Sequence, residues 1–105
     1  MTDKIVVLST CESAEQAEKL ARALVEQRLA ACVNIIPGMR SVYRWKGAIE
    51  DTGEFLLLIK SRRDLFDQMR LEIEKQHSYE VPEVIALPIV EGAENYLEWL
   101  RVETT

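Results

Sequence analysis

Residues 32–61 read CVNIIPGMRSVYRWKGAIEDTGEFLLLIKS, and this stretch decides the fold. Two runs rich in β-branched and aromatic residues flank a polar segment that contains glycine, aspartate and threonine, which is the pattern of a β-hairpin. We expect its loop at residues 47–53 and its return strand at residues 55–60. The arms are long for so small a protein, because strands usually run about 5 or 6 residues.

A strand and a helix are predicted before the hairpin. Residues 5–8 are apolar and short, as in a buried strand. Ser13 with Gln16 three residues later forms a capping-box pattern at a helix start. The apolar positions that then recur at helical spacing are Ala17, Leu20, Ala21 and Leu24.

A second helix, a strand and a short terminal helix are predicted after the hairpin. Ser61 and Asp64 flank the second helix start, and residues 84–90 form a strand. The terminal helix has its apolar positions at Tyr96, Leu97 and Leu100, with Trp99 beside them. The element order predicts an α+β fold, a ferredoxin-like βαββαβ sandwich with a long hairpin between its second and third strands and an extra C-terminal helix.

Prolines support this topology, because proline cannot donate to a strand ladder and favours sheet edges. Pro37 falls in the second strand and Pro88 in the fourth, which this fold places at the edges. The strands are apolar at nearly every position, so both sheet faces need a cover. We therefore expect a homo-oligomer that buries the open sheet face and the hairpin.

Length and charge narrow the classes of function. The 105 residues fit a single domain, 1–105, and the formal net charge is −5 with scattered basic residues. This charge argues against nucleic acid and anionic membranes as partners. The first residues lack a signal-peptide pattern, and no apolar run is long enough for a membrane span, so we expect a cytoplasmic protein with reduced cysteines.

Several segments at matching spacing resemble the CutA family of divalent-cation tolerance proteins. The resemblance extends from the first strand to Leu100, and its motifs are residues 29–38, 41–47, 58–60, 77–83 and 96–100. It implies a ferredoxin-like subunit in a homotrimer, similar in architecture to the PII signalling proteins. It also implies a non-enzymatic function linked to tolerance of copper and other divalent metals.

His77 and Cys11 are the candidate metal ligands, since imidazole and thiol suit copper. The alternative for His77 is a helix C-cap, where the helix dipole favours an imidazolium. Family members with a proposed copper site have a cysteine where this chain has Ser9 and a histidine where it has Gln76. No obligatory cofactor is expected, with copper or another divalent cation as a weakly bound ion. Cys32 is interpreted as a small buried hydrophobe.

A second candidate site is a cleft between subunits. Aromatic walls with one cation and one carboxylate suit a small polar ligand, and its candidate residues are Tyr43, Trp45, Lys60, Tyr79 and Glu83. The alternative function is then a PII-like adaptor that binds a small anionic ligand or a protein partner. The plainer interpretation is that these residues form the subunit contact, with Lys60 paired to an acid such as Glu83. No nucleophile–base pattern is present, so no catalytic residue is predicted.

Overall fold

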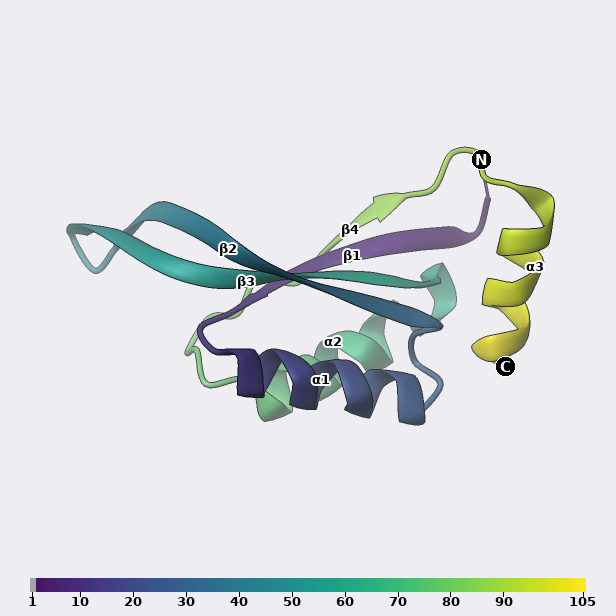
Figure 1. The fold of residues 1–105 in the computed structure, drawn as a ribbon, viewed down its shortest axis with the longest axis horizontal. Coiled ribbons are helices and arrows are strands. Elements are labelled where there is room, and N and C mark those ends of the chain that lie inside the picture. The colour runs from purple at the N-terminus through teal and green to yellow at the C-terminus, as the bar shows by residue number, and fades with distance from the viewer. Residues whose placement is uncertain (1) are drawn as a thin grey trace.

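A four-stranded antiparallel sheet forms the centre of the computed structural model, which describes residues 2–105 (Figure 1). Its strand order is β2-β3-β1-β4, and α1 and α2 cover one face. The elements in chain order are β1 (Lys4–Cys11), α1 (Ala14–Glu26), β2 (Cys32–Trp45), β3 (Ala48–Arg62), a 3₁₀ helix (Arg63–Leu65), α2 (Phe66–Gln76), β4 (Ile85–Pro88) and α3 (Glu94–Glu103). The predicted ferredoxin-like α+β sandwich, with its long hairpin and extra C-terminal helix, is confirmed.

The two strands that contain proline lie at the sheet edges, as predicted. β2 contains Pro37 and β4 ends at Pro88, while the central strands β1 and β3 contain no proline. The β2–β3 register shifts between Ile36 and Met39, so β2 bulges around Pro37. An edge strand accommodates this bulge because one side of its backbone has no neighbouring strand.

The turn of the hairpin is tighter than predicted, and the expected loop at residues 47–53 is wrong. Lys46 and Gly47 form a two-residue turn with positive φ angles of 48° and 83°, and β3 begins at Ala48. Two consecutive positive φ angles are typical of a type I′ turn, whose twist matches the flanking strands. Residues 48–53, including the acidic pair Glu50 and Asp51, therefore pair with β2 as strand.

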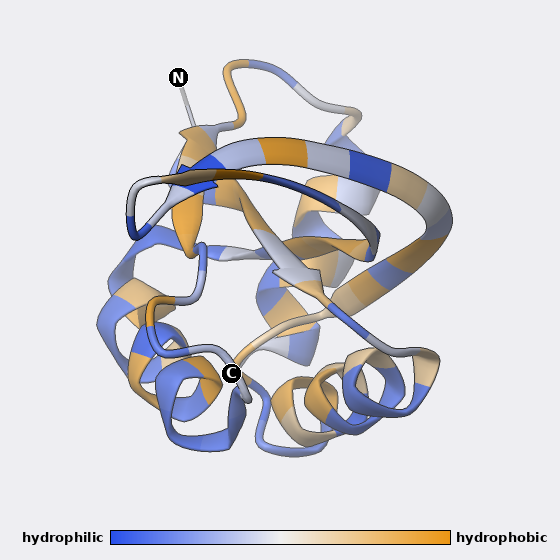
Figure 2. Cartoon of the chain, turned by 90° about the vertical axis from the view of Figure 1, so that its left-hand side faces the viewer, coloured by the Kyte–Doolittle hydropathy of each residue, from blue (hydrophilic) through white to orange (hydrophobic). Residues whose placement is uncertain are grey.

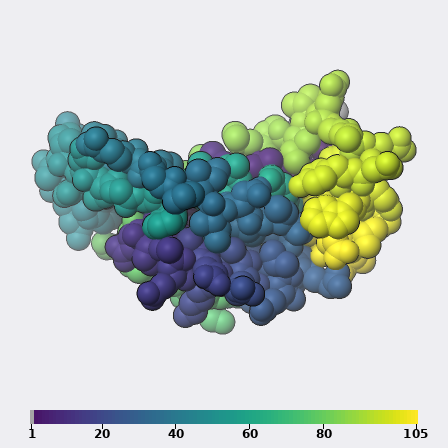
Figure 3. All heavy atoms as spheres, in the orientation of Figure 1, coloured from purple at the N-terminus to yellow at the C-terminus, as the bar shows by residue number. Residues whose placement is uncertain are grey.

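The tip of the hairpin extends beyond the helices into solvent (Figure 3). The molecule measures 44 × 25 × 23 Å along its principal axes, and the hairpin lies along the longest of them. Polar and apolar residues are mixed along its strands when the molecule is viewed from the hairpin end (Figure 2). A strand whose surface is exposed to water can have the polar composition of a loop. This explains why the pattern of residues 47–53 predicts a loop although residues 48–53 form strand.

Helix α1 begins and packs largely as predicted. The Ser13 hydroxyl accepts a hydrogen bond from the Gln16 backbone N–H at 3.2 Å. The Gln16 side chain does not complete the capping box and instead donates to the Gln76 carbonyl at the end of α2, at 3.3 Å. The buried residues of α1 are Ala17, Leu20, Ala21 and Leu24.

Helix α2 begins differently from the prediction. It starts at Phe66 after the 3₁₀ helix, without a side-chain cap. The Ser61 hydroxyl, expected near this start, donates to the Leu29 carbonyl at 2.6 Å. Within residues 2–105, no helix combines the length and the apolar character needed to cross a membrane.

The sheet register determines which face each strand residue occupies. Val7 of β1 lies opposite Ile59 of β3, and both are fully buried beneath the helices. Their neighbours Leu8 and Leu58 point to the other face, because strand residues alternate. Leu87 of β4, opposite Val6, is 50% exposed on that same face. A single chain therefore leaves an apolar sheet face largely open, as predicted.

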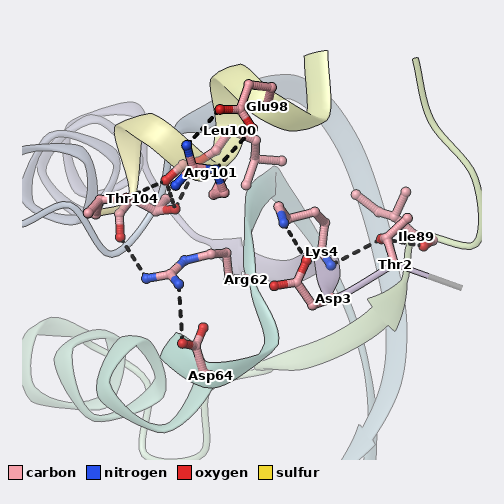
Figure 4. Close-up of polar contacts among 11 residues, drawn as sticks. Thr2, Asp3, Lys4, Arg62, Asp64, Ile89, Glu98, Leu100, Arg101 and Thr104 are labelled. Carbon is pink, nitrogen blue, oxygen red and sulfur yellow. Dashed lines mark hydrogen bonds and ion pairs between the residues drawn. The ribbon is translucent and has the colours of Figure 1, made fainter. Parts of the chain in front are cut away.

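Helix α3 packs at the end of the sheet, beside the end of β3 (Figures 1 and 4). The Thr104 hydroxyl donates to the Leu100 carbonyl at 2.8 Å, and Leu100 is fully buried. Arg62, the last residue of β3, donates from Nη2 to the Thr104 carbonyl at 2.8 Å. The same guanidinium contacts Asp64, with Nη1 3.2 Å from Oδ2.

The turn provides a test of the hairpin geometry. Replacing Gly47 with alanine should lower the free energy of unfolding by about 1 kcal/mol, since a side chain strains a backbone in the left-handed region. An added Cβ at Gly47 has no heavy atom within 4 Å, so the effect comes from the backbone alone. Urea unfolding at one fixed protein concentration measures this change.

Gly53→Ala is the matched control. Gly53 also has open space around an added Cβ, but its φ lies outside the left-handed region. The control should be neutral or stabilising by up to about 1 kcal/mol. Equal destabilisation by the two substitutions would contradict the two-residue turn.

Candidate functional site

A cavity of about 640 Å³ lies between the hairpin and the loop that connects α2 to β4. β1 supplies one wall residue, Thr10, and β3 supplies Glu54. The remaining wall comes from β2 and from the loop. The lining residues are Thr10, Ser41, Val42, Tyr43, Trp45, Glu54, Ser78, Tyr79, Glu80, Val81 and Glu83.

The hairpin contributes its residues through the alternation of its two strands. Ser41, Tyr43 and Trp45 are two apart along β2 and therefore share a face. Glu54 lies opposite Met39, two positions before Ser41, so it joins the same face from β3. Only 7% of Glu54 is exposed, although it is charged.

The loop is attached to the hairpin by a hydrogen bond between Tyr79 and Glu54. The Tyr79 hydroxyl donates to Glu54 Oε2 at 2.6 Å. Burial raises the pKa of the Tyr79 phenol, and the hydrogen bond to Glu54 and the charge of that carboxylate raise it further. Tyr79 therefore keeps its proton and acts as a donor at neutral pH.

His77 lies at the end of α2 and uses both ring nitrogens. Nδ1 accepts the backbone N–H of Tyr79 at 3.0 Å, so the ring proton is assigned to Nε2. Nε2 then donates to the Thr10 carbonyl at 2.7 Å. His77 is the C-cap residue of α2, and its backbone N–H donates to the Ile73 carbonyl at 2.9 Å. The ring thus joins the loop to the end of β1.

The two predicted metal ligands lie next to each other. Cys11 Sγ is 4.0 Å from His77 Nε2. Burial, together with the nearby charges of Glu54 and Glu12, raises the pKa of the Cys11 thiol to about 11. The described part of the chain contains no group of three or more His, Cys, Asp or Glu residues placed to hold a metal ion. Cys11 and His77 therefore offer at most two ligands of these types to an ion.

Four of the five predicted cleft residues line the cavity, and Lys60 does not. Tyr43, Trp45, Tyr79 and Glu83 are lining residues. Lys60 lies near the other end of β3, opposite Cys32, and its ammonium donates to the Asn34 side-chain oxygen rather than to Glu83.

Glu54 and Glu80 are the charged lining residues that sequence reasoning missed. Glu54 precedes a run of five apolar residues, and that change of character is the signal that could have identified it.

Comparisons with known proteins point to one family. The family model described as "CutA1 divalent ion tolerance protein" matches residues 5–103. The divalent-cation tolerance protein CutA of Thermus thermophilus is 50% identical over 99 residues, covering 94% of this chain and 96% of that protein. The chloroplastic protein CutA of Arabidopsis thaliana is 48% identical over 100 residues, or 95% of this chain and 55% of that protein. The chain thus spans about half the length of the plant relative.

A solved structure agrees along the whole chain. The crystal structure of CutA from Xylella fastidiosa has a TM-score of 0.96 to this chain at 39% sequence identity. The match covers 99% of this chain and 100% of that one.

Thiol chemistry tests the environment of Cys11. The thiolate is the reactive form, so a fully buried thiol with a raised pKa should resist alkylation. In the folded protein at about pH 8, iodoacetamide should leave Cys11 unmodified, and the rate should rise as the pH approaches 11. Peptide mass spectrometry measures each cysteine separately.

The urea-unfolded chain is the control, because there both thiols are accessible. Cys32, which is partly exposed, provides an internal comparison in the folded protein. If Cys11 reacts equally fast in the folded and unfolded protein, the buried environment described for it is wrong.

Proposed function

The chain belongs to the CutA1 divalent ion tolerance family, and from this premise we propose that it is a non-enzymatic homotrimer that binds or senses copper-class divalent ions weakly. The observation that carries the metal proposal is the contact between Cys11 and His77, at 4.0 Å. A thiol and an imidazole are donors that suit copper and zinc.

The distance between the two side chains suits a shared ion. Zinc lies about 2.3 Å from a thiolate sulfur and about 2.0 Å from an imidazole nitrogen. An ion between Cys11 Sγ and His77 Nε2, 4.0 Å apart, can therefore reach both with a bent arrangement. The residues present thus fit a two-ligand site.

The same surroundings make the proposed binding weak. An ion on Nε2 must displace the hydrogen bond from His77 to the Thr10 carbonyl, which is 2.7 Å long. The Cys11 thiol must also lose its proton, and its pKa of about 11 opposes this at neutral pH. Such a site would respond to excess metal and would release it when the concentration falls.

The lack of catalysis in the proposal agrees with the state of these groups. A general base needs a nitrogen that is free to accept a proton, and His77 already accepts the Tyr79 N–H at Nδ1. A nucleophilic cysteine needs a lowered pKa, whereas that of Cys11 is raised.

The trimeric part of the proposal rests on the uncovered sheet face. Leu8 and Leu58 lie in its centre, and the exposed Ile85 and Leu87 extend it across β4. A contiguous apolar surface of this kind is typical of a subunit interface. A second copy of the same chain is the occupant that the family resemblance implies.

Calorimetric titration tests the metal proposal. His77→Ala and Cys11→Ser should each weaken binding of Cu²⁺ about tenfold or more, because each removes one of two protein ligands. Zn²⁺, which does not oxidise thiols, should likewise bind the unmodified protein more tightly than either site variant. The matched control is Cys32→Ser, which removes the other thiol and should leave the affinity unchanged. Unchanged affinity in both site variants would reject the pair as ligands.

Analytical ultracentrifugation tests the assembly. The unmodified protein should sediment with three times the 12.1 kDa mass of one chain. Leu87→Glu should shift it toward lower mass, since it places a charge on the exposed part of the proposed interface.

Leu71→Glu is the control for this change, because Leu71 is similarly exposed, at 57%, on α2. A monomeric unmodified protein would refute the assembly, and equal dissociation by both variants would refute the choice of face.

A further inference from the structure

The hairpin cavity has an acidic lining, and these carboxylates are not ligands of the proposed metal site. Glu54, Glu80 and Glu83 line it, and its lining within residues 2–105 includes no lysine, arginine or histidine. Lys60, the cation expected for an anionic ligand, belongs to another part of β3. The cavity is therefore suited to a positively charged ligand rather than to an anion.

Glu54 is the carboxylate best placed to recognise a cation. It is more than nine-tenths buried, and its hydrogen bond with Tyr79 engages only Oε2. A buried carboxylate attracts a cation more strongly than a solvated one, because the local dielectric constant is lower.

Aromatic side chains supply the second element of cation recognition. Tyr43 and Trp45 line the cavity from β2, and Tyr79 lines it from the loop. The faces of such rings attract cations, and groups of aromatic walls are used by proteins to bind quaternary ammonium ions. The volume of about 640 Å³ lies within the range of small-molecule sites.

The chain itself provides an example of this chemistry at the edge of the cavity. The Lys46 ammonium lies over the Trp45 ring, 5.5 Å from its centroid. The same nitrogen is 3.5 Å from Glu80 Oε2. An alkylammonium group is thus already held between an aromatic face and a carboxylate of the cavity wall.

From these observations we propose that the hairpin cavity binds a small organic cation, with its ammonium group between the aromatic ring of Tyr43 and the carboxylate of Glu54. The site goes beyond the metal proposal, because it uses other residues and another class of ligand. Tyr79 acts as a positioning residue, since its hydroxyl holds Glu54 by a hydrogen bond of 2.6 Å.

Calorimetric titration with choline chloride tests this site on the full chain in its native assembly. Choline should bind with a dissociation constant in the millimolar range. Its uncharged carbon analogue, dimethylbutanol, has nearly the same shape and should bind at least about tenfold more weakly, which corresponds to the loss of one favourable charge interaction. Sodium phosphate should give no binding.

Two variants and one control identify the residues. Glu54→Gln keeps an oxygen for the Tyr79 hydroxyl, removes the charge and should weaken choline binding about tenfold or more. Tyr43→Leu should weaken it at least about threefold through loss of the aromatic face. Glu91→Gln, at an exposed position outside the cavity, changes the net charge equally and should have no effect. Circular dichroism and thermal unfolding verify that each variant is folded.

The possible results of these titrations either support the site or overturn it. Choline binding that is weakened in both Glu54→Gln and Tyr43→Leu, with dimethylbutanol bound at least about tenfold more weakly than choline, supports the site. Absence of choline binding, equal binding of dimethylbutanol, phosphate binding in its place, or an effect of Glu91→Gln as large as that of Glu54→Gln would each overturn it.

Discussion

The register of the central sheet is the constraint on which the rest of the structure depends. With Val7 opposite Ile59, one set of β1 and β3 residues meets α1 and α2, and the alternate set faces away from them. A slip of one residue would reverse both sets, because side chains alternate along a strand. The same alternation turns Glu54 toward the cavity and away from the helices. The apolar open face and the polar cavity are therefore two consequences of one pairing.

Strand order, edge prolines and the α1 core face could be predicted from the sequence because each depends on local chemistry. Pro37 cannot donate a hydrogen bond, and Leu20 and Leu24 recur at helical spacing whatever surrounds them. The hairpin turn could not be predicted, because Lys46 adopts a positive φ angle, which is uncommon for lysine. Only the pairing of residues 48–53 with β2 shows that this polar segment is strand.

The candidate site could be predicted only in part, for a similar reason. Cys11 and His77 have side chains that suggest metal binding wherever they occur, but the partner of the His77 ring is the Thr10 carbonyl, and backbone groups carry no sequence signal. Lys60 is predicted as a cleft residue because it follows the apolar run of the return strand. It lies six strand positions, or about 20 Å, beyond the lining residue Glu54. A sequence pattern shows that residues share a strand and does not show which of them a loop will meet.

The loop after α2 connects the elements of the site. His77 binds the end of β1 through its ring, and Tyr79 binds β3 through Glu54. The Tyr79 backbone N–H also donates to His77 Nδ1, so the two contacts are adjacent. The loop can hold the cavity wall in place only if the register brings Glu54 within reach of Tyr79.

A double-mutant cycle between Glu54→Gln and Tyr79→Phe, followed by urea unfolding, tests this contact most directly. We expect a coupling free energy of about 1 kcal/mol or more, since each single change weakens or removes the same buried, charge-assisted hydrogen bond. Strictly additive effects would mean that the two side chains do not interact, and would contradict the register and the cavity built on it.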